Sequence, residues 1–178
     1  MMDQGGIHII QATSPEEIEG ARALMREYIT WAFTIEEGAE EAPTFLGIEE
    51  ELANLPGIYT PPLGRLFYAT HEGQAAGCVC LKPLDKETCE VKRLYVSPAK
   101  RGLAIGTLLM TELMKAAREC GYKRALLDSH VTMKNAHAIY QAAGFQQIPA
   151  PPGYPDNIDE IAIFMECDLT IAPPLDPR

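Results

Sequence analysis

The residues best suited to chemistry lie between Cys89 and Phe145. Within this segment a glycine-bearing turn, Lys100 to Gly106, joins a strand to a helical stretch. A helix N-terminus offers unpaired backbone N–H groups and the positive end of the helix dipole to an anion. Gly102 and Gly106 have no side chain, so a phosphate can approach the backbone closely, and Arg101 adds a fixed positive charge. The turn therefore predicts a site for a phosphate-bearing ligand.

The strand before this turn, Cys89 to Val96, carries charged residues such as Glu90 and Lys92. A strand that is covered on both faces of a sheet should be almost entirely apolar. Unpaired charge is costly to bury, so this strand must either pair its charges or open into a wet cleft. Period-two alternation predicts that Glu90 and Lys92 share a face with Leu94 and Val96.

The composition is that of a single globular domain over residues 1–178, with a proline-rich tail at 170–178. No apolar run approaches the ~20 residues of a membrane span, and the first residues lack the pattern of a signal peptide. The five cysteines include no C-x-x-C pair, which predicts buried free thiols in a reduced, cytoplasmic protein. We expect no metal site and no membrane partner.

The net charge of −10 argues against a nucleic-acid partner, because binding to phosphate backbones depends on Lys and Arg. The charge is also unevenly distributed. Residues 16–51 hold eleven Glu against only Arg22 and Arg26, so this segment carries −9 and the rest of the chain −1. Two interpretations stay open: a solvated pair of acidic helices, or a field that attracts a cationic acceptor such as an amine.

The N-terminal third is predicted to hold one strand and two helices. Residues Ile7 to Ala12 are an apolar strand. The run Ser14 to Glu17 is a capping box with proline at the first helical position, and helical spacing continues to about Trp31. A weaker helix spans Phe45 to Leu55, and a loop follows from Pro56 to Gly64.

The rest of the chain alternates strands and helices. Strands are expected at Arg65–Thr70, Ala75–Leu81, Cys89–Val96, Ala125–Ser129 and within Ile158–Leu169, and helices at Ile105–Cys120 and about Met133–Ala143. This order predicts an α/β fold of the α+β type, a sandwich around a mixed, mostly antiparallel sheet. The helical crossover between the Cys89 and Ala125 strands should make that pair parallel.

The central segment resembles the GNAT superfamily of acetyl-CoA-dependent N-acetyltransferases. Residues 101–106 (R-G-L-A-I-G) meet their signature R/Q-x-x-G/A-x-G/A, and residues 135–145 meet a second, N-x-x-x-x-Y-x-x-x-G-F. The resemblance covers residues 65–169 well and the N-terminal third in outline. The chain departs from the usual pattern at Ala104, where most members carry Gly.

The resemblance implies a three-layer fold and a place for acetyl-CoA. In this superfamily a β-bulge commonly splays the Cys89 strand from the Ala125 strand, and the gap admits the pantetheine arm. The backbone N–H at the Val96 position commonly binds the thioester carbonyl. Asn135 would contact the coenzyme or, alternatively, only cap its helix. The coenzyme-binding residues implied are Leu94, Tyr95, Val96, Arg101, Gly102, Leu103, Ala104, Ile105, Gly106, Thr107 and Asn135.

The resemblance also implies two residues that move protons. Glu90 would be the general base, directly or through a water, and Tyr140 would donate a proton to the departing thiolate. A base is needed because a lysine-like amine has a pKa of about 10.4, so forming the neutral amine at pH 7 costs roughly 4–5 kcal/mol. The alternatives are that Glu90 pairs with Lys92 or Arg93 and that Tyr140 only packs in the core.

Three functions are weighed: acetylation of a small primary amine, acetylation of a protein amine, and binding of acyl-CoA without catalysis. No cysteine is expected in the cleft beside a histidine, which favours direct transfer in a ternary complex. His130 and His137 lie near the site in sequence without a named partner. Tyr28, Trp31 and Phe33, with the Pro56–Gly64 loop, would close over a small acceptor or simply pack. A homodimer is possible by resemblance.

Overall fold

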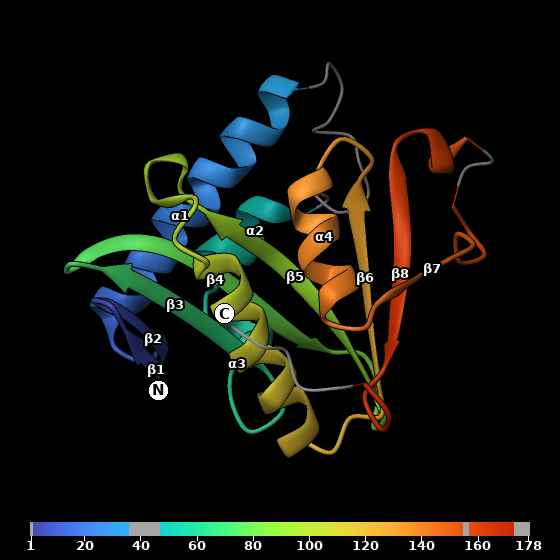
Figure 1. Cartoon of the computed structure of the whole chain (residues 1–178), viewed down its shortest axis with the longest axis horizontal. Coiled ribbons are helices and arrows are strands. Elements are labelled where there is room, and N and C mark those ends of the chain that lie inside the picture. Colours follow the sequence, from blue (N-terminus) through green and yellow to red (C-terminus); the bar gives the residue numbers. More distant parts are fainter. Residues whose placement is uncertain (1, 36–46, 155–156, 173–178) are drawn as a thin grey trace.

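The computed structural model describes residues 2–35, 47–154 and 157–172, and its centre is one eight-stranded sheet (Figure 1). The strand order is β1-β2-β3-β4-β5-β6-β8-β7. Of the neighbouring pairs, β5 and β6 are parallel and the other six are antiparallel, as the sequence predicted. The strands are β1 (Met2–Gln4), β2 (Ile7–Gln11), β3 (Arg65–His71), β4 (Gln74–Pro83), β5 (Thr88–Val96), β6 (Arg124–His130), β7 (Gln146–Ile148) and β8 (Ala162–Asp168).

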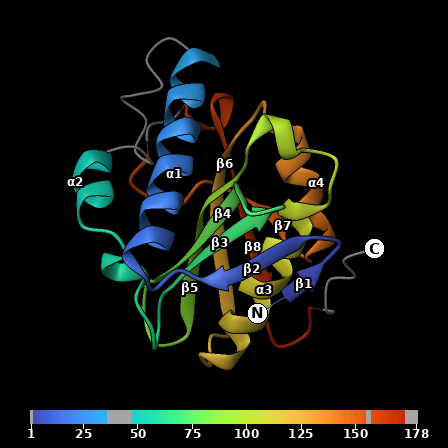
Figure 2. The same cartoon turned by 90° about the vertical axis from the view of Figure 1, so that its left-hand side faces the viewer.

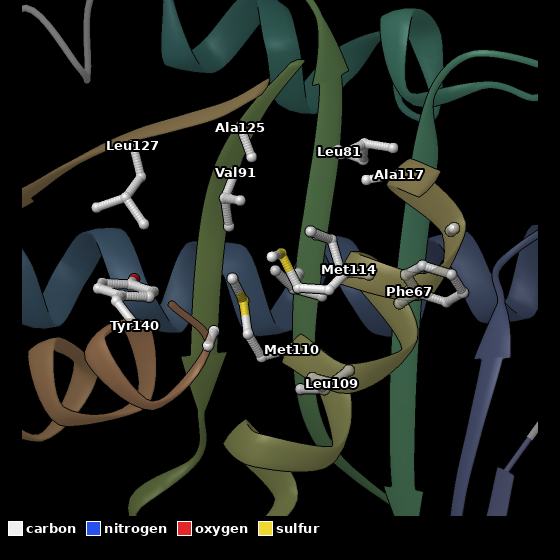
Figure 3. Packing of buried hydrophobic residues seen from close by; sticks show 14 of the residues in the cluster. Phe67, Leu81, Val91, Leu109, Met110, Met114, Ala117, Ala125, Leu127 and Tyr140 are labelled. Atoms are coloured by element: carbon white, nitrogen blue, oxygen red, sulfur yellow. The ribbon is translucent and has the colours of Figure 1, made fainter. Parts of the chain in front are cut away.

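Helices cover both faces of the sheet, which gives the three layers (Figure 2). On one face lie α1 (Pro15–Ile35) and α2 (Ile48–Ala53), and on the other lie α3 (Ile105–Glu119) and α4 (Lys134–Ala142). Each face has its own apolar core. Figure 3 shows side chains of α3 packing against those of the strands. This core, on the face covered by α3 and α4, includes Leu81, Val91, Leu109, Met110 and Leu127.

The start of α1 follows from its first residues. The Ser14 N–H donates to the Glu17 carboxylate at 2.9 Å, and the Glu17 N–H donates to the Ser14 hydroxyl at 3.2 Å. This reciprocal pair is the predicted capping box, and it satisfies two N–H groups that a helix start otherwise leaves unpaired. The helix runs to Ile35, one turn beyond the predicted end at Trp31.

The structure contains two short strands that the sequence did not predict. β1 and β7 have three residues each, which is too short for an alternating pattern to be recognised. The second helix is shorter than expected, Ile48–Ala53, and Phe45 lies outside the described residues, as do 173–178 of the tail. The remaining predicted strands and helices are confirmed to within a few residues.

The pairing of β5 with β6 ends early. Their parallel register covers Thr88↔Arg124, Cys89↔Ala125 and Glu90↔Leu126, whereas β6 pairs with β8 along its whole length. Beyond Glu90 the two strands diverge, which is the predicted splay.

A β-bulge in β5 accompanies this divergence. Cys80 pairs with Lys92, but Cys78, two residues earlier in β4, pairs with Tyr95, three residues later in β5. Arg93 has a φ of 59°, in the left-handed region. The extra residue reverses which face the following side chains occupy.

The prediction that Glu90 and Lys92 share a face with Leu94 and Val96 is therefore wrong. Leu94 and Val96 pack against the core under α3 and α4. Lys92 is paired with Cys80, whose side chain belongs to the core under α1 and α2. Strict alternation failed because one inserted residue shifts the pattern by one.

Candidate functional site

A cleft of about 650 Å³ opens where β5 and β6 diverge. Its walls come from both helical layers: Tyr28 and Trp31 of α1 on one side, and the N-terminal ends of α3 and α4 on the other. The cleft therefore lies beside the end of β5 and the turn that follows β6. Ten of the eleven predicted coenzyme-binding residues line it: Leu94, Tyr95, Val96, Arg101, Gly102, Ala104, Ile105, Gly106, Thr107 and Asn135. Leu103 is 40% exposed and does not line it.

The turn before α3 has the conformation that an anion site needs. Gly102 has a φ of 82°, and Ala104, at the N-cap of α3, has a φ of 59°. The first helical hydrogen bond is donated by Leu108 to the Ala104 carbonyl at 3.0 Å, and no side chain caps the helix. The N–H groups of the first helical turn are therefore available to a bound group at the cleft.

Arg101 lies at the mouth of the cleft. Its guanidinium is 5.6 Å from the centre of the Trp31 ring, a cation–π contact, and its Nε donates to the Val96 carbonyl at 3.3 Å. These contacts join α1 to the turn and to the end of β5. A positive charge is thus held beside the free N–H groups of α3.

Gly106 allows α3 to pack closely at the cleft. A Cβ at this position would lie 2.8 Å from Ile139 Cδ1 and 3.6 Å from Val96 Cγ2. The second glycine of the signature therefore serves close packing of α3 against α4 and β5. Asn135 is exposed at the start of α4 and lines the cleft, while Met133 occupies the N-cap, so Asn135 does not cap this helix.

Tyr140 lies on α4 and is 6% exposed, with its ring 6.1 Å from that of Phe145 (Figure 3). In the described part of the chain its hydroxyl makes no hydrogen bond to another residue. Burial, and then the nearby Tyr28 and Asp128, raise the pKa of Tyr140. The phenol therefore keeps its proton at neutral pH and can donate it.

Glu90 forms ion pairs with two lysines. Its carboxylate lies 3.4 Å from Lys92 Nζ and 3.6 Å from Lys82 Nζ, and its side chain is 17% exposed. Glu90 is not on the wall of the 650 Å³ cleft. Of the structural pairings considered from the sequence, the one with Lys92 is present. Arg93 instead binds Glu51 of α2, at 3.0 and 2.9 Å.

Asp128 is a further carboxylate near the divergence of β5 and β6 that the sequence reasoning did not single out, and like Glu90 it is not on the cleft wall. It lies on β6 opposite Phe164 of β8, two residues beyond Leu126, where the pairing with β5 ends. Burial, reinforced by the charge of Glu90, raises its pKa, although the charge of Lys92 opposes this effect. The available signal was the same as for Glu90, a charged residue in an otherwise apolar strand.

Much of the acidic N-terminal segment is used structurally. Glu27 accepts hydrogen bonds from Tyr95 and Ser97, at 2.9 and 3.0 Å. Glu51 binds Arg93 and also accepts a hydrogen bond from Tyr59 at 2.9 Å. These carboxylates attach α1 and α2 to β5. They therefore have a structural role in addition to any attraction of a cationic acceptor.

Of the remaining candidates from the sequence, some line the cleft and others make structural contacts elsewhere. Tyr28, Trp31 and Phe33 all pack against the core under α1, and of these Tyr28 and Trp31 also line the cleft. Residues 56–59 of the Pro56–Gly64 loop line a separate hollow of about 260 Å³ with Glu51 and Lys82, so this loop does not close the main cleft. His137 is buried, and its Nε2 lies 3.0 Å from the His130 carbonyl and 3.2 Å from the Ser129 hydroxyl. His137 thus has a structural role. His130 Nδ1 is bonded to Thr132 at 2.7 Å.

Among the described residues, no helix is long and apolar enough to cross a membrane.

Several known proteins are similar to this chain in sequence. An uncharacterized N-acetyltransferase of Schizosaccharomyces pombe is 33% identical over 96% of this chain and 99% of its own length. An IAA acetyltransferase of Azospirillum brasilense is 31% identical over 73% of this chain and 87% of its own.

Solved structures share the fold at lower identity. An acetyltransferase of Streptococcus agalactiae has a TM-score of 0.71 at 20% identity, covering 92% of this chain and 98% of its own. The PaiA N-acetyltransferase of Thermoplasma acidophilum, solved in complex with coenzyme A, has a TM-score of 0.66 at 20% identity over 91% of this chain and 98% of its own.

The sequence pattern of the Acetyltransferase (GNAT) family matches residues 23–145, from α1 through both predicted signatures to Phe145. This span holds the turn and the end of β5, which line the cleft, together with β6 and Tyr140, which are not on its wall. The chain belongs to the GNAT family of acetyltransferases.

Proposed function

We propose that the protein binds acetyl-CoA in the 650 Å³ cleft and transfers the acetyl group to the primary amine of a small molecule. The observation that carries this proposal is the cleft itself, which is lined by ten residues of the predicted coenzyme-binding pattern and lies at the end of the sheet where β5 and β6 have diverged. Family membership and the coenzyme-bound structures of fold relatives support it.

In this proposal the N–H groups at the start of α3 and the charge of Arg101 hold the pyrophosphate. The pantetheine arm lies in the gap between the strands, with the thioester near the end of β5. Arg101 and Trp31 both line the cleft and contact each other, and we infer from this wall of α1 a small acceptor rather than a protein chain.

Both substrates are bound together, and the amine attacks the thioester carbon directly. Tyr140 protonates the departing thiolate, for which its raised pKa keeps the proton available. Glu90 is held by Lys82 and Lys92 away from the cleft wall, so we assign it an action on the amine through an intervening group rather than by contact.

Two measurements test this function. Acetyl-CoA at about 100 times its Kd should stabilise the fold by about 2.7 kcal/mol. For a chain of this size that is a rise in Tm of roughly 5–11 °C. Arg101→Ala should reduce this rise, and no rise at millimolar acetyl-CoA would overturn the coenzyme assignment.

The second measurement is a screen of small amines and lysine peptides with acetyl-CoA, following the release of thiol. Turnover with a small amine is expected. Turnover with peptides alone would make the protein a protein acetyltransferase, and binding without any turnover would make it a non-catalytic module.

A further inference from the structure

We propose that Asp128 is the residue that contacts the acceptor's ammonium group and takes its proton, and that Glu90 acts through it. This inference rests on the proposed N-acetyl transfer. It starts from the register of the sheet. Glu90 pairs with Leu126 at the last point where β5 and β6 are joined, so the sheet is still closed there. Asp128 lies two residues further, beyond the point of divergence.

Glu90 and Asp128 lie at different distances along their strands from the end of β5, where the thioester would lie. On β5 the cleft begins at Leu94, four residues after Glu90, which is on the order of 13 Å in an extended strand. Because β5 and β6 start in parallel register, Asp128 lies two residues, about 7 Å along the strand direction, nearer the cleft end of the sheet than Glu90, although neither carboxylate lines the cleft. Asp128 is therefore better positioned to reach an amine that attacks at the cleft.

Asp128 also faces the correct side of the sheet. Ala125 and Leu127 point into the core under α3 and α4, so the alternate residues Leu126 and Asp128 face α1 and α2. In the described part of the chain, no hydrogen bond or ion pair joins the Asp128 side chain to another residue. Its carboxylate is thus half-buried and makes no ion pair with another residue of the described chain, unlike that of Glu90.

Charged and titratable groups surround Asp128 from several elements. On β5 these are Lys92 and Arg93, which favour its ionised form, and Glu90, which disfavours it. Tyr28 of α1 is close enough for the Asp128 charge to raise its pKa.

Two further tyrosines complete the surroundings of Asp128. The pKa of Tyr140 on α4 and that of Tyr154 before β8 are both raised, first by burial and also by the charge of Asp128. The ring of Tyr154 lies 4.9 Å from that of Phe164, the β8 partner of Asp128. An ammonium at Asp128 would thus have aromatic neighbours, which suit a cation. Tyr140 belongs to the core under α3 and α4, so it comes from the helical layer opposite to that of Tyr28.

The proton balance follows from this arrangement. The substrate ammonium gives one proton to the Asp128 carboxylate, and the neutral nitrogen attacks the thioester carbon. The C–N bond forms and the C–S bond breaks as the thiolate leaves. Tyr140 gives its proton to the thiolate and regains one from the former amine nitrogen. Asp128 releases its proton to solvent, so the products are the amide, the thiol and one proton.

The test is the pH dependence of kcat/KM, measured in the full chain with the best amine from the screen. Asp128→Asn should lower kcat/KM at pH 7 by about 100-fold or more, the usual contribution of a general base. This defect should shrink as the pH approaches the amine's own pKa, because solvent then supplies the neutral amine. Asp128→Glu should restore part of the activity.

Glu90→Gln gives the discriminating result. Removing the Glu90 charge lowers the pKa of Asp128, so the acidic limb of the kcat/KM profile should move to lower pH while substantial activity remains. Glu166→Gln is the matched control. Glu166 lies on the same face, opposite Leu126, and is 42% exposed, so its variant should leave the profile unchanged.

Other outcomes overturn the assignment. If Asp128→Asn keeps the wild-type pH profile while Glu90→Gln abolishes turnover, Glu90 is the direct base. If the Asp128→Asn defect is the same at every pH, Asp128 is merely structural. A thermal shift with acetyl-CoA in each variant separates these results from loss of folding or of coenzyme binding. A screen without any acceptor would instead reject the proposed function itself.

Discussion

Replacing Ala104 by glycine should make the protein more stable. Ala104 has φ 59° and ψ 11°, in the left-handed region, at the N-cap of α3. For a residue with a Cβ this conformation costs roughly 1–2 kcal/mol, whereas glycine adopts it freely. Glycine loses more conformational entropy on folding, about 0.5–1 kcal/mol. The difference is a net stabilisation of about 0.5–1 kcal/mol for Ala104→Gly.

At roughly 2–4 °C per kcal/mol for a chain of this length, the expected rise in Tm is about 1–4 °C. The assay is thermal unfolding followed by circular dichroism, without ligand and at fixed pH. Ala99→Gly is the control, because Ala99 is also exposed and lies five residues away in the 3-10 turn Pro98–Lys100. Its backbone is helical, so glycine there gains nothing and should leave Tm unchanged or lower.

A Tm for Ala104→Gly at or below that of the wild type, matching Ala99→Gly, would refute the reasoning. It would mean that the backbone at the signature turn is not strained by the methyl group. The departure of this chain from the family's usual glycine would then carry no measurable cost.

The other predictions concern proton donation, packing and acid stability. Tyr140→Phe should lower kcat at pH 7 by about 100-fold while the thermal shift with acetyl-CoA persists; wild-type turnover would leave Tyr140 a packing residue. Gly77→Ala should lower Tm by an amount equivalent to about 1–3 kcal/mol, because the new Cβ would lie 2.7 Å from the backbone carbonyl of Tyr95; an unchanged Tm would show that the strands yield. Burial raises the pKa of Glu51, but the hydrogen bond and charge of Arg93 outweigh this and hold it below its usual 4.5. Stability from this pair is therefore complete at neutral pH and lost as pH falls through the lowered pKa, so Glu51→Gln should lower Tm at pH 7 and flatten its decline between about pH 5 and pH 3 in melting curves. An equally steep decline would contradict it.

The parts of the fold that the sequence predicted are those fixed by neighbouring residues. The capping box of α1 is specified by residues three apart, and the turn before α3 by six consecutive ones. Helical patterns longer than one turn identified the other main helices, and alternating patterns longer than four residues identified the other main strands. β1 and β7, with three residues each, exist only because a neighbouring strand pairs with them, which local patterns do not reveal.

The candidate site was predictable to the same extent. Ten of the predicted coenzyme-binding residues line one cleft: nine lie between Leu94 and Thr107, at the end of β5 and the start of α3, and Asn135 lies at the start of α4. The neighbours of Asp128 come instead from α1, β5, α4 and the loop before β8, so no spacing in the sequence connects them.

At the bulge around Arg93, prediction from strand alternation fails. The bulge decides which side chains of β5 face the cleft. Without it, Leu94 and Val96 would lie on the same face as Glu90, and a coenzyme at the end of β5 would meet that carboxylate directly. With it, the strand shows its charged residues to α1 and α2 and its apolar end to α3 and α4. The left-handed conformation of Arg93 is stabilised by the bidentate contact with Glu51, 42 residues away in α2. Asp128 lies on β6, and its place beyond the last paired residues of β5 and β6 follows from the pairing of distant strands, which is why only the three-dimensional structure makes it a candidate.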